Sequence, residues 1–304
     1  MVVGSSNIDM IAYAQRLPEK GETVYGDSFA LGFGGKGANQ AVMSSRLGAN
    51  VHMVNTLGDD VFGETTIANY HEQGIDTSYI ARVAGSSGVA PIWVEPDGTN
   101  RIIIVPGANN AMTPAQGVNA INTIADIDVV IGQLEIPQAV TAAAFAAAQA
   151  RGIPTILNPA PYVPLIAELL AASDWIMPNE SEFAAFHPRN LLPESDEIIQ
   201  ELANHLHKKL VVTLGAAGAA WCSPQGQVQR VAAPKVVAID STGAGDAFVG
   251  AFAYGIAAGM EEITAINLGC LCASDSVTRK GTQSSYPTKE QASALIIAAA
   301  KQRA

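Results

Sequence analysis

The chain has 304 residues, of which 48% are hydrophobic and 15% are charged, so it can bury a large core and is not a disordered chain. Its net charge of −11 argues against a nucleic-acid partner, because binding a phosphate backbone needs clustered Lys and Arg; a small nucleotide can still be held by backbone N–H groups and a metal ion. Three cysteines without metal-ligand spacing (Cys222, Cys270 and Cys272), no apolar run as long as a membrane span and no signal peptide together predict a protein of the reducing cytoplasm.

The hydrophobic pattern predicts strands and helices in alternation along the chain. Buried strands are expected at residues 2–4, 51–57, 126–134, 155–157, 175–177 and 210–214. Helices are expected between them, at residues 37–47, 61–73, 138–151 and 195–208. This alternation predicts an α/β fold in which helices cover both faces of a mainly parallel sheet.

Two stretches depart from this alternation. Residues 25–33 alternate apolar and polar side chains, and residues 89–105 contain a predicted hairpin with a Pro-Asp-Gly turn. They predict a small antiparallel sheet that projects as a lid and excludes water, or that supports dimerisation with one of its faces. We assign residues 9–38 and 88–108 to this lid. The core is assigned residues 1–8, 39–87 and 109–304.

Polar residues follow most of the predicted parallel strands, at the edge of the sheet where open α/β proteins bind ligands. Each group alone could be a turn or a helix cap. Together they predict one polar binding edge, made by Asn7 and Asp9, Glu135, Asn158, Asn179 and Glu182, and Leu214 and Gly215.

The segment Asp240–Asp246 combines a glycine turn with a carboxylate. Gly243, Ala244 and Gly245 leave the backbone bare before a helix, so their N–H groups and the helix dipole favour an anion. Asp246 at the same place is a candidate general base, the combination that phosphoryl transfer to an alcohol requires. The alternative is structural, because Asp often caps helices and Gly-Ala-Gly often makes a tight turn.

The segment Gly34–Asn39 resembles two nucleotide-binding motifs but fits neither. Ala30 stands where a Walker A loop needs its first glycine, and Gly37 stands where it needs Ser or Thr. The spacing of Gly32, Gly34 and Gly37 matches a dinucleotide fingerprint, but the preceding segment alternates and does not read as a buried strand. We expect instead that the glycines let a polyol approach the main chain, with an amide supplied by Asn39.

The two segments together resemble the signatures of the ribokinase family, also called the PfkB family of carbohydrate kinases. The resemblance extends over essentially the whole chain, from residues 4–9 to residues 281–287, with both signatures in the family's order. It implies a ribokinase-like fold with a small antiparallel β lid. It also implies ATP-dependent phosphorylation of D-ribose at O5, with Mg²⁺ and a K⁺ activator.

Residue roles follow from this resemblance position by position. The implied catalytic groups are the base Asp246 and the anion-hole residues Gly243, Ala244 and Gly245. The implied sugar-binding positions are Asn7, Asp9, Gly35, Lys36, Asn39, Glu135 and Asp246. The implied positions around ATP and Mg²⁺ are Asn179, Glu182, Thr213, Gly215, Gly245 and Cys270. The implied monovalent-cation positions are Asp240, Thr242, Ser276, Arg279, Gly281 and Ser285.

The substrate has a rival within the same family, 2-deoxyribose kinase, and other pentose or nucleoside kinases remain alternatives. Residues 9–13, 87–92 and 281–287 resemble the deoxyribose group, whereas Asn7 favours ribose because an amide can bind the 2-hydroxyl. A sugar-binding protein without catalysis is a remote alternative. The exposed lid also predicts a homodimer.

Overall fold

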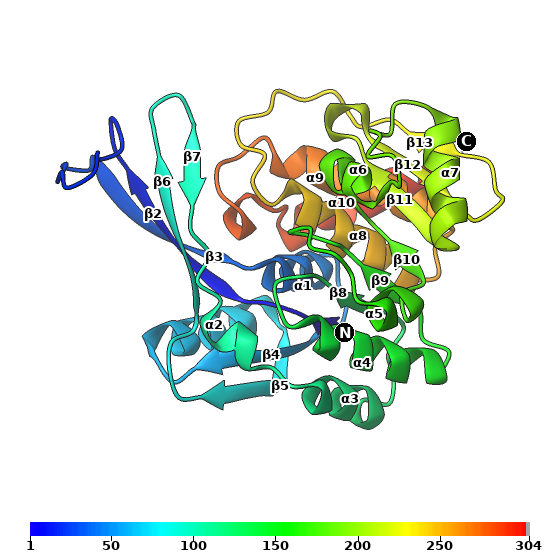
Figure 1. Cartoon of the computed structure of the whole chain (residues 1–304), viewed down its shortest axis with the longest axis horizontal. Coiled ribbons are helices and arrows are strands. Elements are labelled where there is room, and N and C mark those ends of the chain that lie inside the picture. The colour runs from blue at the N-terminus through cyan, green and yellow to red at the C-terminus, as the bar shows by residue number, and fades with distance from the viewer. Residues whose placement is uncertain (302–304) are drawn as a thin grey trace.

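The computed structural model describes residues 1–301, which form a large sheet between two helical layers and a smaller sheet that projects from it (Figure 1). The large sheet has the strand order β13-β12-β11-β10-β9-β8-β1-β4-β5. Its strands are β1 (Val2–Val3), β4 (His52–Gly58), β5 (Asp76–Val83), β8 (Val130–Gly132), β9 (Thr155–Leu157), β10 (Trp175–Ile176), β11 (Lys209–Thr213), β12 (Ala219–Cys222) and β13 (Gln229–Val231). Neighbours from β5 to β11 pair in parallel, and β12 and β13 extend the sheet antiparallel at one edge.

Successive strand residues point to opposite faces of this sheet, and each face has its own apolar core. Val2 packs in the core on one face, while Val3 packs in the core on the other. The first face is covered by α1 (Lys36–Arg46), α2 (Val61–Gln73), α8 (Ala244–Ala257), α9 (Glu262–Ser276) and α10 (Lys289–Lys301). The second face is covered by α3 (Pro114–Thr123), α4 (Gln138–Ala150), α5 (Ala167–Ala171), α6 (Glu180–Phe186) and α7 (Asp196–Leu206). The predicted α/β fold is confirmed.

The smaller sheet contains the two stretches that depart from the alternating pattern. Its order is β3-β2-β6-β7, with β2 (Asn7–Tyr13), β3 (Ser28–Gly34), β6 (Gly88–Val94) and β7 (Asn100–Ile102). The outer pairs are antiparallel, as predicted, but the central pair of β2 and β6 is parallel. The reason is topological: β2 follows β1 and β6 follows β5, so both leave the parallel sheet in the same direction.

Several predicted element limits hold closely, and one does not. The helix predicted at 61–73 and the strand predicted at 155–157 have those limits in the structure. The strand predicted at 126–134 was wrong in length, because only Val130–Gly132 pairs with β1 and β9. Asp126 and Asp128 precede the pairing region, where their charges stay outside the apolar layers. Within residues 1–301, no helix is both long and apolar enough to cross a membrane.

The polar residues Asn7 and Asp9 lie on β2 of the smaller sheet and not in a loop after β1. This sheet therefore contributes side chains directly to the edge where β1, β8 and β9 end. The division into a core and a lid at the residue limits given above remains a prediction. The three cysteines are free and buried, and burial raises the pKa of Cys270 to about 12.

Candidate active site

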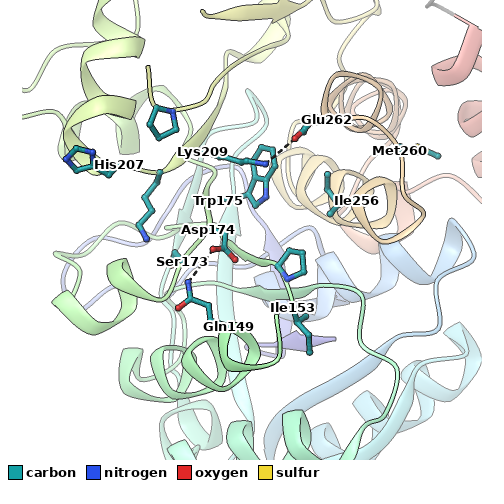
Figure 2. Close-up of a pocket in the computed structure, with 14 residues that line it drawn as sticks. Gln149, Ile153, Ser173, Asp174, Trp175, His207, Lys209, Ile256, Met260 and Glu262 are labelled. Atoms are coloured by element: carbon teal, nitrogen blue, oxygen red, sulfur yellow. Dashed lines mark hydrogen bonds and ion pairs between the residues drawn. The ribbon is translucent and has the colours of Figure 1, made fainter. Parts of the chain in front are cut away.

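Cavities lie at both ends of the parallel strands, and the predicted site residues belong to only one end. The larger cavity, of about 780 Å³, lies before β9, β10 and β11 (Figure 2). There Lys209 Nζ lies 3.1 Å from Glu262 and 4.5 Å from the centre of the Trp175 ring, while Gln149 donates to Asp174. No predicted site residue lines this cavity.

A cavity of about 390 Å³ lies at the opposite end, between β11 and the N-terminus of α8. It brings together four residues predicted to lie near the nucleotide, namely Thr213, Gly215, Gly245 and Cys270. Mostly apolar side chains from residues 233–238, from α8 and from α9 form much of the remaining wall. An apolar cavity that reaches the start of a helix suits a flat base with a phosphate chain, because the helix N-terminus attracts the anion.

The N-terminus of α8 carries the predicted base. Gly243 precedes the helix with φ of 76°, a left-handed conformation that favours glycine. A Cβ on Gly243 would lie 2.6 Å from Thr282, so a larger residue has no room. Asp246 lies in the first turn and is 6% exposed. The structure therefore places a buried carboxylate in the first turn of the helix that Gly243 precedes, where the Ala244 backbone N–H donates to the Ser241 backbone oxygen at 3.2 Å.

Two amides hold the Asp246 carboxylate in place. Asn39 Nδ2 donates to one carboxylate oxygen and Gln40 Nε2 donates to the other, both at 2.9 Å. These donors are themselves held by further amides: Gln283 donates to Asn39 at 3.0 Å, and Gln133 donates to Gln40 at 2.7 Å. All four amides are buried, so the orientation of Asp246 is set by a connected network and not by solvent.

The acidic groups of the site lie close enough to influence one another. Burial, Glu135 and Asp246 together raise the pKa of Asp9 to about 7. Lys36 compensates part of this negative charge. Asp246, Glu135 and Glu182 raise the pKa of Lys36, although burial acts to lower it. Glu135 also accepts hydrogen bonds from the Lys36 backbone N–H at 2.9 Å and from the Ser5 hydroxyl. These groups form a charged cluster whose side chains can each exchange hydrogen bonds with hydroxyl groups.

The glycines of the 34–37 segment also allow close packing within the protein, and their predicted role in sugar binding stays a prediction. A Cβ on Gly34 would lie 2.3 Å from the Asp9 carboxylate, and one on Gly35 would lie 2.7 Å from the Asn7 backbone nitrogen. The side of the main chain that lacks Cβ atoms is thus filled by the protein itself, and the glycines let β2 pack against the start of α1. Gly32 and Gly34 lie within β3 of the smaller sheet and Gly37 follows it, which excludes the dinucleotide fingerprint because that motif follows a strand of the parallel sheet.

Asn179 and Glu182 form a capping box at the start of α6. The Asn179 side chain accepts from the Glu182 backbone N–H at 2.8 Å, and Glu182 Oε2 accepts from the Asn179 backbone N–H at 2.9 Å. Burial raises the pKa of Glu182, while Lys36 acts to lower it. The structure brings Glu182 under the electrostatic influence of Lys36 and Asp246. Neither Asn179 nor Glu182 lines the 390 Å³ cavity.

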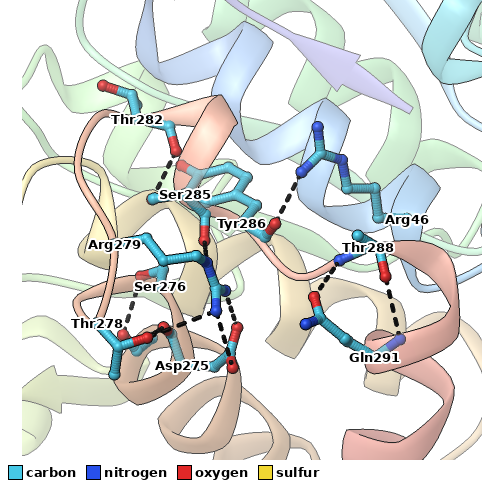
Figure 3. Close-up of polar contacts among 11 residues, drawn as sticks. Arg46, Asp275, Ser276, Thr278, Arg279, Thr282, Ser285, Tyr286, Thr288 and Gln291 are labelled. Atoms are coloured by element: carbon cyan, nitrogen blue, oxygen red, sulfur yellow. Dashed lines mark hydrogen bonds and ion pairs between the residues drawn. The ribbon is translucent and has the colours of Figure 1, made fainter.

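The six predicted cation positions lie on two segments that Asp240 joins. Its carboxylate accepts from the Thr242 backbone N–H and from the Gly281 backbone N–H, both at 2.9 Å. Burial acts to raise the pKa of Asp240, but these bonds and the Thr242 hydroxyl lower it overall. On the second segment, Arg279 Nε donates to the Ser285 backbone oxygen at 2.8 Å (Figure 3). Ser276 and Ser285 are buried, and each hydroxyl donates to a backbone oxygen.

Several residues of this site were missed from the sequence. Tyr286 is 2% exposed and donates from its hydroxyl to the Gly243 backbone oxygen at 2.9 Å, which holds the turn before α8. Gln40 contacts Asp246, and Gln283 contacts Asn39, as described above. The sequence predicts that Gln40 lies on a helix next to Asn39. It does not predict that Gln40 contacts Asp246, which is 206 positions away. Buried amides carry no local sequence signal of their partners.

Comparison with known proteins agrees with this geometry. The family model described as pfkB family carbohydrate kinase matches residues 1–289. The chain is 37% identical to a deoxyribokinase of Salmonella typhi (95% of this chain, 96% of the relative) and 36% identical to a ribokinase of Bacillus subtilis (97% and 98%). Its structure resembles that of Arabidopsis thaliana ribokinase complexed with ribose and ATP, with a TM-score of 0.89, 30% identity and 97% coverage of each chain. A ribokinase from Thermotoga maritima gives a TM-score of 0.88 at 33% identity, covering 97% of this chain and 98% of that one. The chain therefore belongs to the pfkB family of carbohydrate kinases.

Proposed function

We propose that the protein transfers the γ-phosphoryl group of ATP to O5 of D-ribose, giving ribose 5-phosphate and ADP. The observation that carries this proposal is Asp246: a buried carboxylate, oriented by two amides, in the first turn of the helix that borders the 390 Å³ cavity. A pure sugar-binding protein has no need of a base at the end of a nucleotide-sized cavity.

In this mechanism Asp246 accepts the proton of the sugar hydroxyl as the hydroxyl oxygen attacks the γ-phosphorus. The bond between that phosphorus and the bridging oxygen of ADP breaks. The N–H groups of Gly243, Ala244 and Gly245 stabilise the negative charge of the transferred group, helped by the dipole of α8. Lys36 offsets the negative charge that Asp246 and Glu135 contribute to the same cluster.

The sugar would lie against β2 and the start of α1. Asn7, Asp9, Gly35, Lys36, Asn39 and Glu135 are the proposed sugar contacts. Carboxylates and amides at these positions suit a ring of hydroxyls, since each can exchange two hydrogen bonds. The smaller sheet contributes Asn7 and Asp9, so its position relative to the core would control both binding and the exclusion of water.

The nucleotide would lie in the 390 Å³ cavity, against Thr213, Gly215, Gly245 and Cys270. Glu182 is the proposed protein carboxylate for Mg²⁺, with Asn179 fixing its orientation through the capping box. A single carboxylate is sufficient, because Mg²⁺ usually keeps several waters and takes its other ligands from substrate phosphates. Bound there, Mg²⁺ would neutralise charge on the phosphates.

The proposed K⁺ site comprises Asp240, Thr242, Ser276, Arg279, Gly281 and Ser285. The oxygen atoms at these positions suit a monovalent cation. The hydrogen bonds of Asp240 favour its ionised form, and the other positions offer backbone and hydroxyl oxygens. When bound, the ion would supply a fixed positive charge beside the anion-hole turn. Initial rates that are equal with potassium and with tetramethylammonium chloride would argue against this site.

The assay that tests the proposed function combines ribose, ATP and Mg²⁺ with detection of ADP. The wild type should release ADP only when sugar is present. Asp246→Asn should still show a cooperative thermal unfolding transition and lose at least ~10²-fold in kcat, the lower range for general base catalysis. Near-normal turnover by that variant would exclude Asp246 as the base, and absence of ADP with every pentose would favour a sugar-binding protein.

Phosphorylation of 2-deoxyribose is the second candidate, and the 37% identity with a deoxyribokinase supports it. The two candidates are separated by comparing kcat/KM for the two sugars with the same enzyme.

We also propose a homodimer formed through the smaller sheet, since Phe29, Leu31 and Ile102 are exposed on its strands. Light scattering would then give twice the chain mass of 31.5 kDa. The buried free thiols support a location in the reducing cytoplasm.

A further inference from the structure

A buried asparagine outside the predicted site, Asn109, contacts the residue on which sugar choice depends. Asn109 lies in the 3₁₀ helix η1 (Gly107–Ala111) and is 1% exposed. Its Oδ1 accepts from the backbone N–H of Ser6 at 3.0 Å, and its Nδ2 donates to the backbone oxygen of the same residue at 3.0 Å. Because a backbone N–H can only donate and a carbonyl can only accept, these two bonds fix which end of the Asn109 amide is the nitrogen.

The fixed amide of Asn109 then fixes the next one. Asn109 Nδ2 also donates to Oδ1 of Asn7 at 2.9 Å. The carbonyl end of the Asn7 amide is thereby engaged by the protein. The nitrogen end is the one that remains available to a ligand, so Asn7 is presented to the site as a hydrogen-bond donor.

The surrounding structure leaves room for this pair and for little else. A Cβ on Gly88 would lie 2.2 Å from Asn109 Nδ2 and 2.3 Å from Asn7 Oδ1. Asn55 Nδ2 lies 3.4 Å from Oδ1 of Asn109 and donates to the Gly4 backbone oxygen at 2.7 Å. Rotation of the Asn109 amide by half a turn would place like groups against one another at Ser6 and Asn7.

We propose that Asn109 is a positioning residue that makes Asn7 a donor to the sugar and thereby sets discrimination between ribose and 2-deoxyribose. This inference rests on the proposed sugar kinase function. Asn7 and Asp9 are two residues apart on β2, so their side chains lie on the same face of the strand. A ribose hydroxyl can accept from Asn7 and donate its own proton to the Asp9 carboxylate. A sugar that lacks this hydroxyl leaves the Asn7 nitrogen unpaired, which disfavours its binding.

The experiment measures kcat/KM for ribose and for 2-deoxyribose in the wild type, Asn109→Ala, Asn7→Ala and the double variant. Asn109→Ala should lower the ribose to 2-deoxyribose ratio about tenfold, through a higher KM for ribose and a much smaller change for 2-deoxyribose. In the Asn7→Ala background, the same change should no longer alter the ratio. Asn267→Ala is the matched control, since it removes a buried amide that bonds a backbone oxygen between α9 and α10.

A second variant keeps the inference testable if Asn109→Ala does not fold. Asn7→Asp preserves the acceptor that faces Asn109 and removes the donor that faces the sugar. It should therefore lower the ratio as far as Asn7→Ala does. A ratio unchanged in Asn109→Ala or in Asn7→Asp, or an equal loss for both sugars, overturns the role of Asn109. Inactivity of the wild type toward both sugars would instead overturn the proposed function itself, and this inference with it.

Discussion

The two ends of the parallel strands differ in how their charged side chains are arranged. Before β9, β10 and β11, the charged groups of the 780 Å³ cavity are paired within the protein: Lys209 with Glu262, and Lys208 with the Ala171 backbone oxygen. After the strands, burial is the main cause of the raised pKa of Asp9, and the charges of Glu135 and Asp246 add to it, although Lys36 interacts with the same two acidic groups. The difference teaches that cavity size is a poor guide to function here. A carboxyl group whose pKa is raised by burial and by like charges is typical of a functional site.

Among changes at the two ends of the strands, neutralising Asp9 is expected to have the largest effect on activity. Asp9→Asn should lower kcat/KM for the sugar by about 10²-fold, since a bond from a hydroxyl to a charged acceptor contributes up to about 3 kcal/mol. The same change should stabilise the protein at neutral pH. The pKa of Asp9 is about 7 in the folded protein, against 3.8 for a free Asp side chain. Protonated Asp9 therefore contributes full stability below about pH 4, and this contribution is lost as the pH rises through about 7.

Unfolding temperatures of the wild type and Asp9→Asn at pH 4, 6 and 8 measure this effect. The variant should exceed the wild type in free energy of unfolding only slightly at pH 4 and more at pH 6, and the difference should level off above pH 7. Its upper limit is about 4 kcal/mol, which corresponds to the rise of the Asp9 pKa from 3.8 to about 7. A stability difference that is constant over this range would show that Asp9 ionises at its usual pH.

A smaller effect is expected from removing one of the amides that orient the base. Gln40→Met keeps the length and burial of the side chain but loses its bond to Asp246, so kcat should fall about tenfold, equivalent to ~1.4 kcal/mol. The KM for the sugar should change little. Gln149→Met is the control: it makes the same substitution at an exposed glutamine whose amide donates to Asp174 in the opposite cavity, and it should leave kcat unchanged. Equal kinetics for both variants would contradict a role for Gln40 in orienting the base.

The smallest effect is expected at the charged groups of the larger cavity. Lys209→Met removes the pair with Glu262, in which both side chains are partly exposed, and the contact with the buried Trp175 ring, so the free energy of unfolding should fall by about 1 kcal/mol. Denaturant titration measures this change, and steady-state kinetics should be unaffected. A loss of activity comparable to that of Gln40→Met would show that the two ends of the strands are coupled.

The local sequence predicted both the elements and the chemical groups of the site. The periodicity of residues 61–73 and 155–157 was enough to place a helix and a strand. The segment Asp240–Asp246 combines glycines with a carboxylate, so a turn, a helix start and a candidate base could be inferred together. Antiparallel pairing was predicted for residues 89–105 from the turn, but the parallel pairing of β2 with β6 depends on where both strands leave the larger sheet.

What the sequence by itself determined was therefore the alternation that gives the α/β fold and the set of candidate groups, namely Asp246 with its glycine turn and the acidic residues Asp9 and Glu135. Only the tertiary structure decided how those groups are oriented. Gln40 and Asn109 hold Asp246 and Asn7 across 206 and 102 positions of the chain. The physical reason is that periodicity and turn chemistry act between near neighbours, whereas the partner of a buried amide is chosen by the packing of distant segments.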